Sequence, residues 1–180
     1  MTHLIRFDRI GGPDVLQWVE ADLPPPAAGE VRIRHEAVGV NYIDTYHRSG
    51  LYPLTLPSGL GQEAAGVIEA VGEGVVDFVP GDRVAYVGGP LGAYSESRNI
   101  AASLLVNLPD SLSFEQGAAM MMQGLTAQYL LRRTYRVQPG DTILIHAAAG
   151  GVGLIVCQWA KALGATVIGT VSSDEKAEIA

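Results

Sequence analysis

The sequence predicts an α/β protein in which a small barrel-like β domain precedes the first βαβ segment of a parallel-sheet domain. Up to about residue 110, short β-forming runs alternate with Gly and Pro. From Ser113 the apolar residues recur at helical spacing, and residues 142–170 follow a strand, glycine-rich turn, helix, strand pattern. We therefore expect three regions, with a helix joining the two domains: 1–112, 113–138 and 139–180.

Six β-forming runs make up the first region, and their turns carry Gly, Pro and Asp. The turn Pro80-Gly81-Asp82 leads directly into one of them, and Gly72 and Gly74 suit positive backbone dihedrals. This rhythm is typical of a small, mostly antiparallel domain. The expected strands are Leu4–Phe7, Val15–Val19, Val31–Ala37, Gly66–Val71, Arg83–Val87 and Leu104–Leu108.

A long helix follows. Ser113 and Gln116 have the spacing of a capping box, and the Ala- and Met-rich segment from Phe114 to Tyr135 has no helix breaker except Gly. We expect this helix to connect the two domains.

The glycine-rich turn predicts a dinucleotide site. The run from Thr142 to His146 is a short apolar strand, Val152–Leu163 has helical spacing, and Ala165–Thr170 is a second strand. Small residues in the turn allow close backbone approach, and amides at a helix N-terminus can face a pyrophosphate. A tight strand-to-helix turn also needs small residues for structural reasons alone. The predicted cofactor-binding residues of the turn are Ala148, Gly150, Gly151, Val152 and Gly153.

The end of the second strand favours NADP over NAD. An NAD site usually has Asp or Glu here, whereas this chain has Ser172 and Ser173, which leave room for an additional phosphate. Lys176 could supply the countercharge. Alternatively, Ser172 and Glu175 form a capping box and Lys176 is a solvated surface residue.

Composition and charge exclude several classes. The 180 residues carry a net charge of −7, which argues against a general nucleic-acid binder. The N-terminus lacks the features of a signal peptide, so we expect a cytoplasmic protein. The uncharged window from Thr142 to Ala160 contains the glycine turn, which favours a buried strand and helix over a membrane span. The single Cys157 permits neither an intrachain disulfide nor a cysteine zinc cluster.

The sheet of the second domain is incomplete in this sequence. A helix begins near Ser172 and Asp174 and has no stop signal before Ala180. Two parallel strands do not make a sheet, so the apolar faces of Ile143, Ile145, Val167 and Ile168 would lack neighbours. We expect the chain to be an N-terminal fragment of a longer enzyme; the alternative is that partner chains complete the sheet.

Together these motifs resemble one family over the whole chain. They are Asn41-Tyr42-Ile43-Asp44-Thr45-Tyr46 with Arg48-Ser49-Gly50, Gly61-Gln62-Glu63-Ala64-Ala65-Gly66-Val67, Pro80-Gly81-Asp82-Arg83-Val84, Gly124-Leu125-Thr126 and the glycine turn. The chain resembles the medium-chain dehydrogenase/reductase superfamily, specifically its zeta-crystallin-like quinone oxidoreductases. The resemblance implies a GroES-like domain and a Rossmann domain with NADPH in the cleft between them. It also implies a homodimer and a chain of nearly twice this length.

Zinc is not expected. The zinc alcohol dehydrogenases of the superfamily carry a cysteine ligand near the position of Asn41 and a histidine where this chain has Gln62. Amides are poor substitutes for thiolate and imidazole. The four histidines are not at ligand spacing, so we interpret them as surface or core residues. Without a Lewis acid, reduction of an electron-poor acceptor is more plausible than oxidation of an alcohol.

The resemblance places Asn41 and Tyr46 at the catalytic site and assigns cofactor contacts to Asn41, Tyr46 and Thr126. Each has a structural alternative. Asn41 could cap the short helix Tyr42–His47, Tyr46 could pack at the domain interface, and Thr126 could bond its own helix backbone. Asp44 and Arg48, four residues apart on that helix, suit a surface ion pair.

The predicted activity is zinc-independent reduction of quinones by hydride transfer from NADPH. The site then mainly orients the two reactants and stabilises charge developing on oxygen. A reductase of enones or alkenals is the nearest alternative, and a non-catalytic, crystallin-like NADPH-binding protein is a third. We expect little activity from these 180 residues alone.

Overall fold

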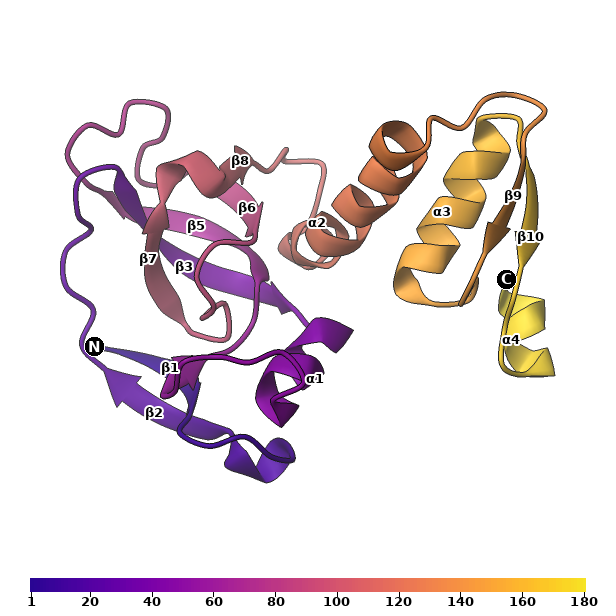
Figure 1. Ribbon diagram of the computed structural model, residues 1–180. Coiled ribbons are helices and arrows are strands. Elements are labelled where there is room, and N and C mark those ends of the chain that lie inside the picture. The colour runs from indigo at the N-terminus through magenta and orange to yellow at the C-terminus, as the bar shows by residue number, and fades with distance from the viewer. The chain divides into compact units, whose positions relative to one another are not determined.

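The computed structural model describes residues 1–180 and forms two compact units, Met1–Met121 and Met122–Ala180 (Figure 1). The boundary between them falls inside helix α2 (Phe114–Tyr129). The finer division at residues 112 and 138 stays a prediction.

The N-terminal unit is built from two antiparallel sheets, as expected for a barrel-like domain. The five-stranded sheet has the order β7 (Ser97–Ala101), β3 (Glu30–Gly39), β5 (Glu63–Val71), β6 (Arg83–Val87) and β8 (Leu105–Asn107). The three-stranded sheet has the order β2 (Gln17–Ala21), β1 (Thr2–Phe7) and β4 (Ser58–Gly59). Short 3-10 turns occur at Pro13–Val15 and Ala102–Leu104.

The core of the N-terminal unit forms because successive side chains of a strand point to opposite faces of the sheet. On β3, Val31 and Ile33 are fully buried, whereas the arginines between and after them face outward in part. Ile68 of β5 and Tyr86 of β6 join the same core cluster. The first four residues of β5, Glu63–Gly66, are all buried, which explains why this half of the strand lacks the apolar and polar alternation typical of a half-buried strand.

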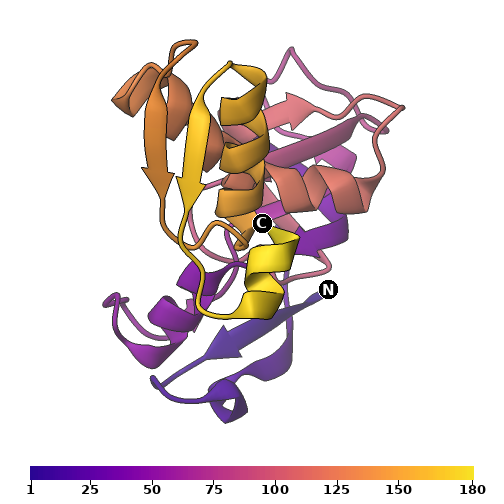
Figure 2. The ribbon, with the colours of Figure 1, turned by 90° about the vertical axis from the view of Figure 1, so that its right-hand side faces the viewer.

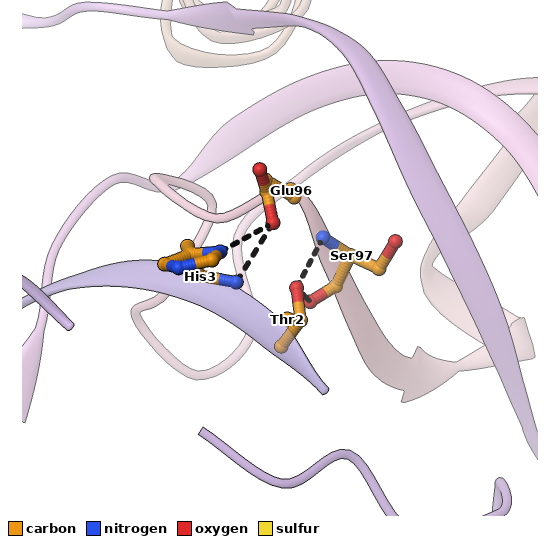
Figure 3. A network of polar contacts seen from close by, with 4 residues as sticks. All are labelled: Thr2, His3, Glu96 and Ser97. Atoms are coloured by element: carbon orange, nitrogen blue, oxygen red, sulfur yellow. Dashed lines mark hydrogen bonds and ion pairs between the residues drawn. The ribbon is translucent and has the colours of Figure 1, made fainter. Parts of the chain in front are cut away.

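Polar contacts hold β1 against the segment that leads into β7 (Figure 3). The hydroxyl of Thr2 accepts from the Ser97 N–H at 3.1 Å. The Glu96 carboxylate accepts from the His3 N–H at 2.8 Å and lies 3.1 Å from the His3 ring. These bonds to His3 lower the pKa of the Glu96 carboxyl. They fasten together two segments that are more than 90 residues apart in the sequence.

The C-terminal unit contains the predicted strand, turn, helix, strand order. Strands β9 (Thr142–Ile145) and β10 (Thr166–Gly169) pair in parallel, with helix α3 (Gly151–Ala162) between them in sequence and α4 (Asp174–Ile179) after them (Figure 2). The end of α2 continues into a π-helical turn at Leu130–Thr134, one residue short of the predicted helix end.

One face of this two-stranded sheet is packed and the other is open. Ile143, Ile145 and Val167 pack into the cluster formed by α2 and α3, so the expectation that these three lack neighbours is wrong. Leu144 and its partner in register, Ile168, are 56% and 53% exposed. Only the face of the sheet that carries Leu144 and Ile168 is therefore exposed. None of the helices combines the length and apolar character that a membrane span requires.

Partly buried His35 links β3 to β6 and to the loop before β7. Its Nδ1 lies 2.7 Å from the Ser95 carbonyl oxygen and its Nε2 lies 3.0 Å from the Tyr86 hydroxyl. Because a carbonyl only accepts, Nδ1 carries the proton and Nε2 accepts from Tyr86. Burial, opposed by the bond to Ser95 and assisted by the positive charge of Arg98, lowers the pKa of His35 to about 4.

Acidification should therefore destabilise the N-terminal unit through His35. The folded state binds a proton at His35 less readily than the unfolded state does. The contribution of neutral His35 to the free energy of unfolding is therefore complete above the ordinary histidine pKa, and it is lost as the pH falls from there towards about 4. We expect a loss of about 2 kcal/mol between pH 7 and pH 5, measured by urea unfolding. The His35→Gln variant should lose that part of the pH dependence, whereas His146→Gln, at an exposed site, should retain it. An unchanged pH profile in His35→Gln would contradict this assignment.

Candidate functional site

Asn41 begins helix α1 (Tyr42–Ser49) and is held from two sides. It is the N-cap residue, and the Asp44 carboxylate accepts from its backbone N–H at 2.9 Å. Its side-chain Nδ2 donates to Oε1 of Glu63, the first residue of β5. All three residues are buried. The capping alternative is therefore realised, and it leaves the carboxamide in a fixed position.

Asp44 is a buried acceptor and not half of a surface pair. Its Oδ2 also accepts from the Tyr94 hydroxyl at 2.7 Å, and it makes no ion pair with Arg48. The expected surface pair is therefore wrong, because Asp44 faces the fold to cap the helix start. Burial, followed by the bond to Asp44, raises the pKa of Tyr94, which stays a phenol donor.

Tyr46 lies in a cluster of aromatic rings on and after α1. Its ring centroid is 5.3 Å from that of Tyr42, edge to face, and 5.3 Å from that of Tyr52. The ring of His47 lies 5.8 Å from Tyr52. Tyr42 and Tyr52 are 76% and 46% exposed. The cluster thus presents aromatic surface to solvent, beside the helix that Asn41 caps.

The second amide of interest, Gln62, contacts an imidazole. Gln62 Nε2 lies 3.2 Å from Nε2 of His47, so the amide donates and the imidazole nitrogen accepts. Neither this pair nor any other part of the chain brings together three His, Cys, Asp or Glu residues placed to hold a metal ion.

In the C-terminal unit, the glycine turn allows α3 to begin almost on top of the preceding backbone. Gly150 is the N-cap, and its N–H bonds to the Ala147 carbonyl at 2.8 Å. A Cβ atom at Gly153 would overlap that same carbonyl oxygen. Ala147 itself takes φ 53°, a left-handed conformation that is costly for any residue except Gly. The turn is thus tightly constrained.

The turn also exposes unused donors. The N–H groups of Gly151, Val152 and Gly153, in the first turn of α3, make no backbone hydrogen bond. Ala148 is buried at 1% exposure, with its N–H bonded to the Thr170 carbonyl. Ala148 therefore shapes the turn, and the three free amides are the groups that can face an anion.

A hollow of about 350 Å³ joins the glycine turn to the end of β10. On the far side of it, Lys176 Nζ lies 3.2 Å from the Ser172 hydroxyl. Ser173, in turn, is the N-cap of α4, accepting from the Lys176 N–H at 3.3 Å. The alternative of a capping box at Ser172 and Glu175 thus lies one residue too early, and Ser172 lines the hollow. The lining residues are Ala147, Ala149, Gly150, Thr170, Val171, Ser172 and Lys176.

Thr126 lies on α2 and bonds its own helix. Its hydroxyl donates to the Met122 carbonyl at 2.7 Å, which is the structural alternative named above. The oxygen keeps lone pairs but has no proton left for a ligand. A role for Thr126 in cofactor binding stays a prediction.

Sequence reasoning missed three polar or aromatic residues beside Asn41. Glu63 and Tyr94 contact Asn41 and Asp44 across 22 and 50 residues of sequence, so no local pattern announces them. Tyr52 could have been found, because it follows the Tyr42 to Tyr46 motif by only one helical turn and a loop.

Comparison with known proteins gives consistent relatives for both units. Residues 27–110 match the family described as alcohol dehydrogenase GroES-like domain. A quinone oxidoreductase of Pseudomonas aeruginosa is 60% identical over the whole chain, which spans 56% of that protein. A 2-haloacrylate reductase of Burkholderia sp. is 52% identical over 94% of this chain and 53% of its own.

A solved structure agrees. The crystal structure of Escherichia coli quinone oxidoreductase complexed with NADPH matches with a TM-score of 0.95 and 54% identity, covering 98% of this chain and 55% of that one. The chain therefore spans about half the length of the relatives it matches.

Replacing Gly153 should destabilise the C-terminal unit. The Cβ of Gly153→Ala meets a backbone oxygen that cannot move aside, so we expect a loss of about 1–3 kcal/mol. The change is measurable by denaturant unfolding followed through Trp159 in a Trp18→Phe background, since the chain has two tryptophans.

The matched control is Gly124→Ala in α2, where an added Cβ meets nothing within 4 Å. It should gain up to about 1 kcal/mol from improved helix propensity. Equal stability of the two variants would show that the turn is not sterically constrained.

Proposed function

Because this chain belongs to the medium-chain dehydrogenases/reductases and groups there with the quinone oxidoreductases, we propose that the full-length protein reduces quinones with NADPH. The observation that carries the proposal is the hollow between Ala147, Ala149 and Gly150 of the glycine turn and Ser172 and Lys176, next to the first turn of α3 with its free amides. One end suits a pyrophosphate and the other suits a phosphate on the ribose.

Preference for NADPH follows from charge. No carboxylate lines the hollow, and Lys176 supplies a cation beside the Ser172 hydroxyl. An Asp or Glu in place of Ser172 would accept from the ribose of NAD but repel a phosphate. The relative of known structure that carries NADPH supports this choice.

We propose that the reaction needs no zinc. Where the zinc enzymes have thiolate and imidazole, this chain has the amides of Asn41 and Gln62. Each amide nitrogen is engaged by a neighbour, Glu63 or His47. An uncharged amide offers only a weak oxygen ligand to zinc, so the donor set does not suit the metal.

The bound cofactor would supply hydride, and the protein would orient the acceptor against it. We assign Asn41 to cofactor binding and Tyr46 to contact with cofactor or substrate. The exposed rings of Tyr42 and Tyr52 beside Tyr46 offer aromatic faces on which a flat quinone ring can stack. Thr126 is kept as a candidate cofactor contact through its oxygen lone pairs.

A second candidate function is reduction of a conjugated carbon–carbon double bond. The 52% identity to a 2-haloacrylate reductase favours it, since hydride delivery to such an acceptor makes the same demands on the site. A non-catalytic NADPH-binding role is the third. We further propose that the protein acts in the cytoplasm as a homodimer.

Lys176 tests the cofactor preference. In the full-length protein, Lys176→Ala should weaken NADPH binding by about fivefold to tenfold and leave NADH binding unchanged, because an exposed ion pair contributes about 1 kcal/mol. Lys161→Ala, which removes the other lysine of this unit from the end of α3, should change neither affinity. Fluorescence titration with both nucleotides measures this; a parallel loss for NADH would remove Lys176 from the phosphate site.

Turnover after chelation tests the reaction. The full-length protein, dialysed against a chelator and shown to be free of zinc, should oxidise NADPH with 1,4-benzoquinone faster than with an enone such as methyl vinyl ketone. The reverse ranking would favour the double-bond reductase. Tight NADPH binding without turnover of either acceptor would instead favour the binding role, and recovery of activity only on adding zinc would refute zinc independence.

A further inference from the structure

The side-chain NH₂ group of Asn41 has a hydrogen-bond acceptor within the protein. Nδ2 points to Oε1 of Glu63, while the backbone N–H of Asn41 is taken by Asp44. Asn41 is 8% exposed, so its remaining contacts are restricted to the small part of the side chain that reaches the surface.

Chemistry fixes which end of the amide faces the carboxylate. The amide nitrogen of Asn41 can only donate, and Oε1 of Glu63 accepts from it, so the NH₂ of Asn41 faces Glu63. The carboxamide oxygen is thereby turned away from Glu63. An amide oxygen has two lone pairs, and the capping contact with the Asp44 N–H uses one of them, which leaves the second without a capping partner.

Glu63 is placed for this contact at a cost to the fold. It is 1% exposed at the start of β5, followed by the buried residues Ala64 and Ala65, and a buried carboxyl group is unfavourable unless it is well bonded. Its partner in register is Gly39, and a Cβ atom there would overlap the Glu63 side chain. Both the strand and its neighbour are thus adapted to hold a carboxylate behind Asn41.

We propose that Glu63 is a positioning residue that orients Asn41 as a hydrogen-bond acceptor for a donor of the nucleotide cofactor, such as a ribose hydroxyl or an amide NH₂. This inference rests on the proposed function. It also gives Asn41 a definite role, because a side chain that presents an oxygen binds donors and does not stabilise an oxyanion on the substrate.

The test compares Glu63→Met, Glu63→Gln and Glu69→Met in the full-length protein, with NADPH affinity as the readout. Glu63→Met leaves Nδ2 without its partner, and we expect about tenfold weaker binding. Glu63→Gln keeps an acceptor oxygen at the same place and should stay within about threefold of the wild type. Glu69→Met, an exposed site on the same strand, should bind like the wild type.

A double-variant cycle separates positioning from general damage. If Glu63 acts through Asn41, then Glu63→Met should weaken NADPH binding no further in an Asn41→Ala background. Equal affinity of Glu63→Met and wild type, or an additive loss in the double variant, would overturn the inference. So would a Glu63→Gln variant as weak as Glu63→Met.

A measurement without cofactor covers the case in which the variants fold poorly. The side-chain NH₂ resonances of Asn41, assigned in the wild type through their bonds to the backbone, should exchange with solvent at least tenfold more slowly than those of exposed Asn107. Equally fast exchange would overturn the proposed bond. Failure of the wild type to bind NADPH would instead refute the proposed function, and the cofactor role of Asn41 with it.

Discussion

The C-terminal unit depends on how closely the first turn of α3 approaches the backbone that precedes it. Gly153 lies against the Ala147 carbonyl, and Ala147 adopts a left-handed conformation to allow it. This close approach lets α3 begin within a few residues of the end of β9, and the first amides of the helix are left unbonded, as in any α-helix. The turn residues that line the hollow, Ala147, Ala149 and Gly150, carry no side chain larger than a methyl group. The space between the turn and Ser172 and Lys176 therefore stays open.

The N-terminal unit solves a different problem, which is to hold polar groups in a mostly apolar interior. Glu63, Asn41, Asp44 and Tyr94 form a chain of hydrogen bonds, so each of these side chains has at least one partner in the chain. The same network caps α1 and thereby fixes the helix on which Tyr46 is carried. The hydrogen bonds that cap α1 are therefore also the bonds that hold the candidate site residue Asn41, so a change that breaks them affects both.

The sequence was most informative where the signal is local. Six strands, the capping box of Ser113 with Gln116 and the whole βαβ order follow from short-range patterns, and the structure contains them. Strand β7 was missed because its residues are polar and only Ile100 is buried. The burial of Asp44 and the partners of Asn41 arise from contacts between distant segments, which periodicity cannot reveal.

The amides of Asn41 and Gln62 each donate a hydrogen bond to a group of the kind that can bind a metal. A zinc site needs anionic or imidazole donors with their lone pairs directed at one point. Here the NH₂ group of Asn41 donates to Oε1 of Glu63, and the NH₂ group of Gln62 donates to Nε2 of His47. Each of the two groups that could serve zinc, a carboxylate and an imidazole, is thus already satisfied by an amide donor. Restoring a metal site would consequently require more than exchanging Asn41 and Gln62, because Glu63 and His47 would be left with buried acceptors to satisfy. Both amides are therefore part of a bonded arrangement that fixes the orientation of their side chains.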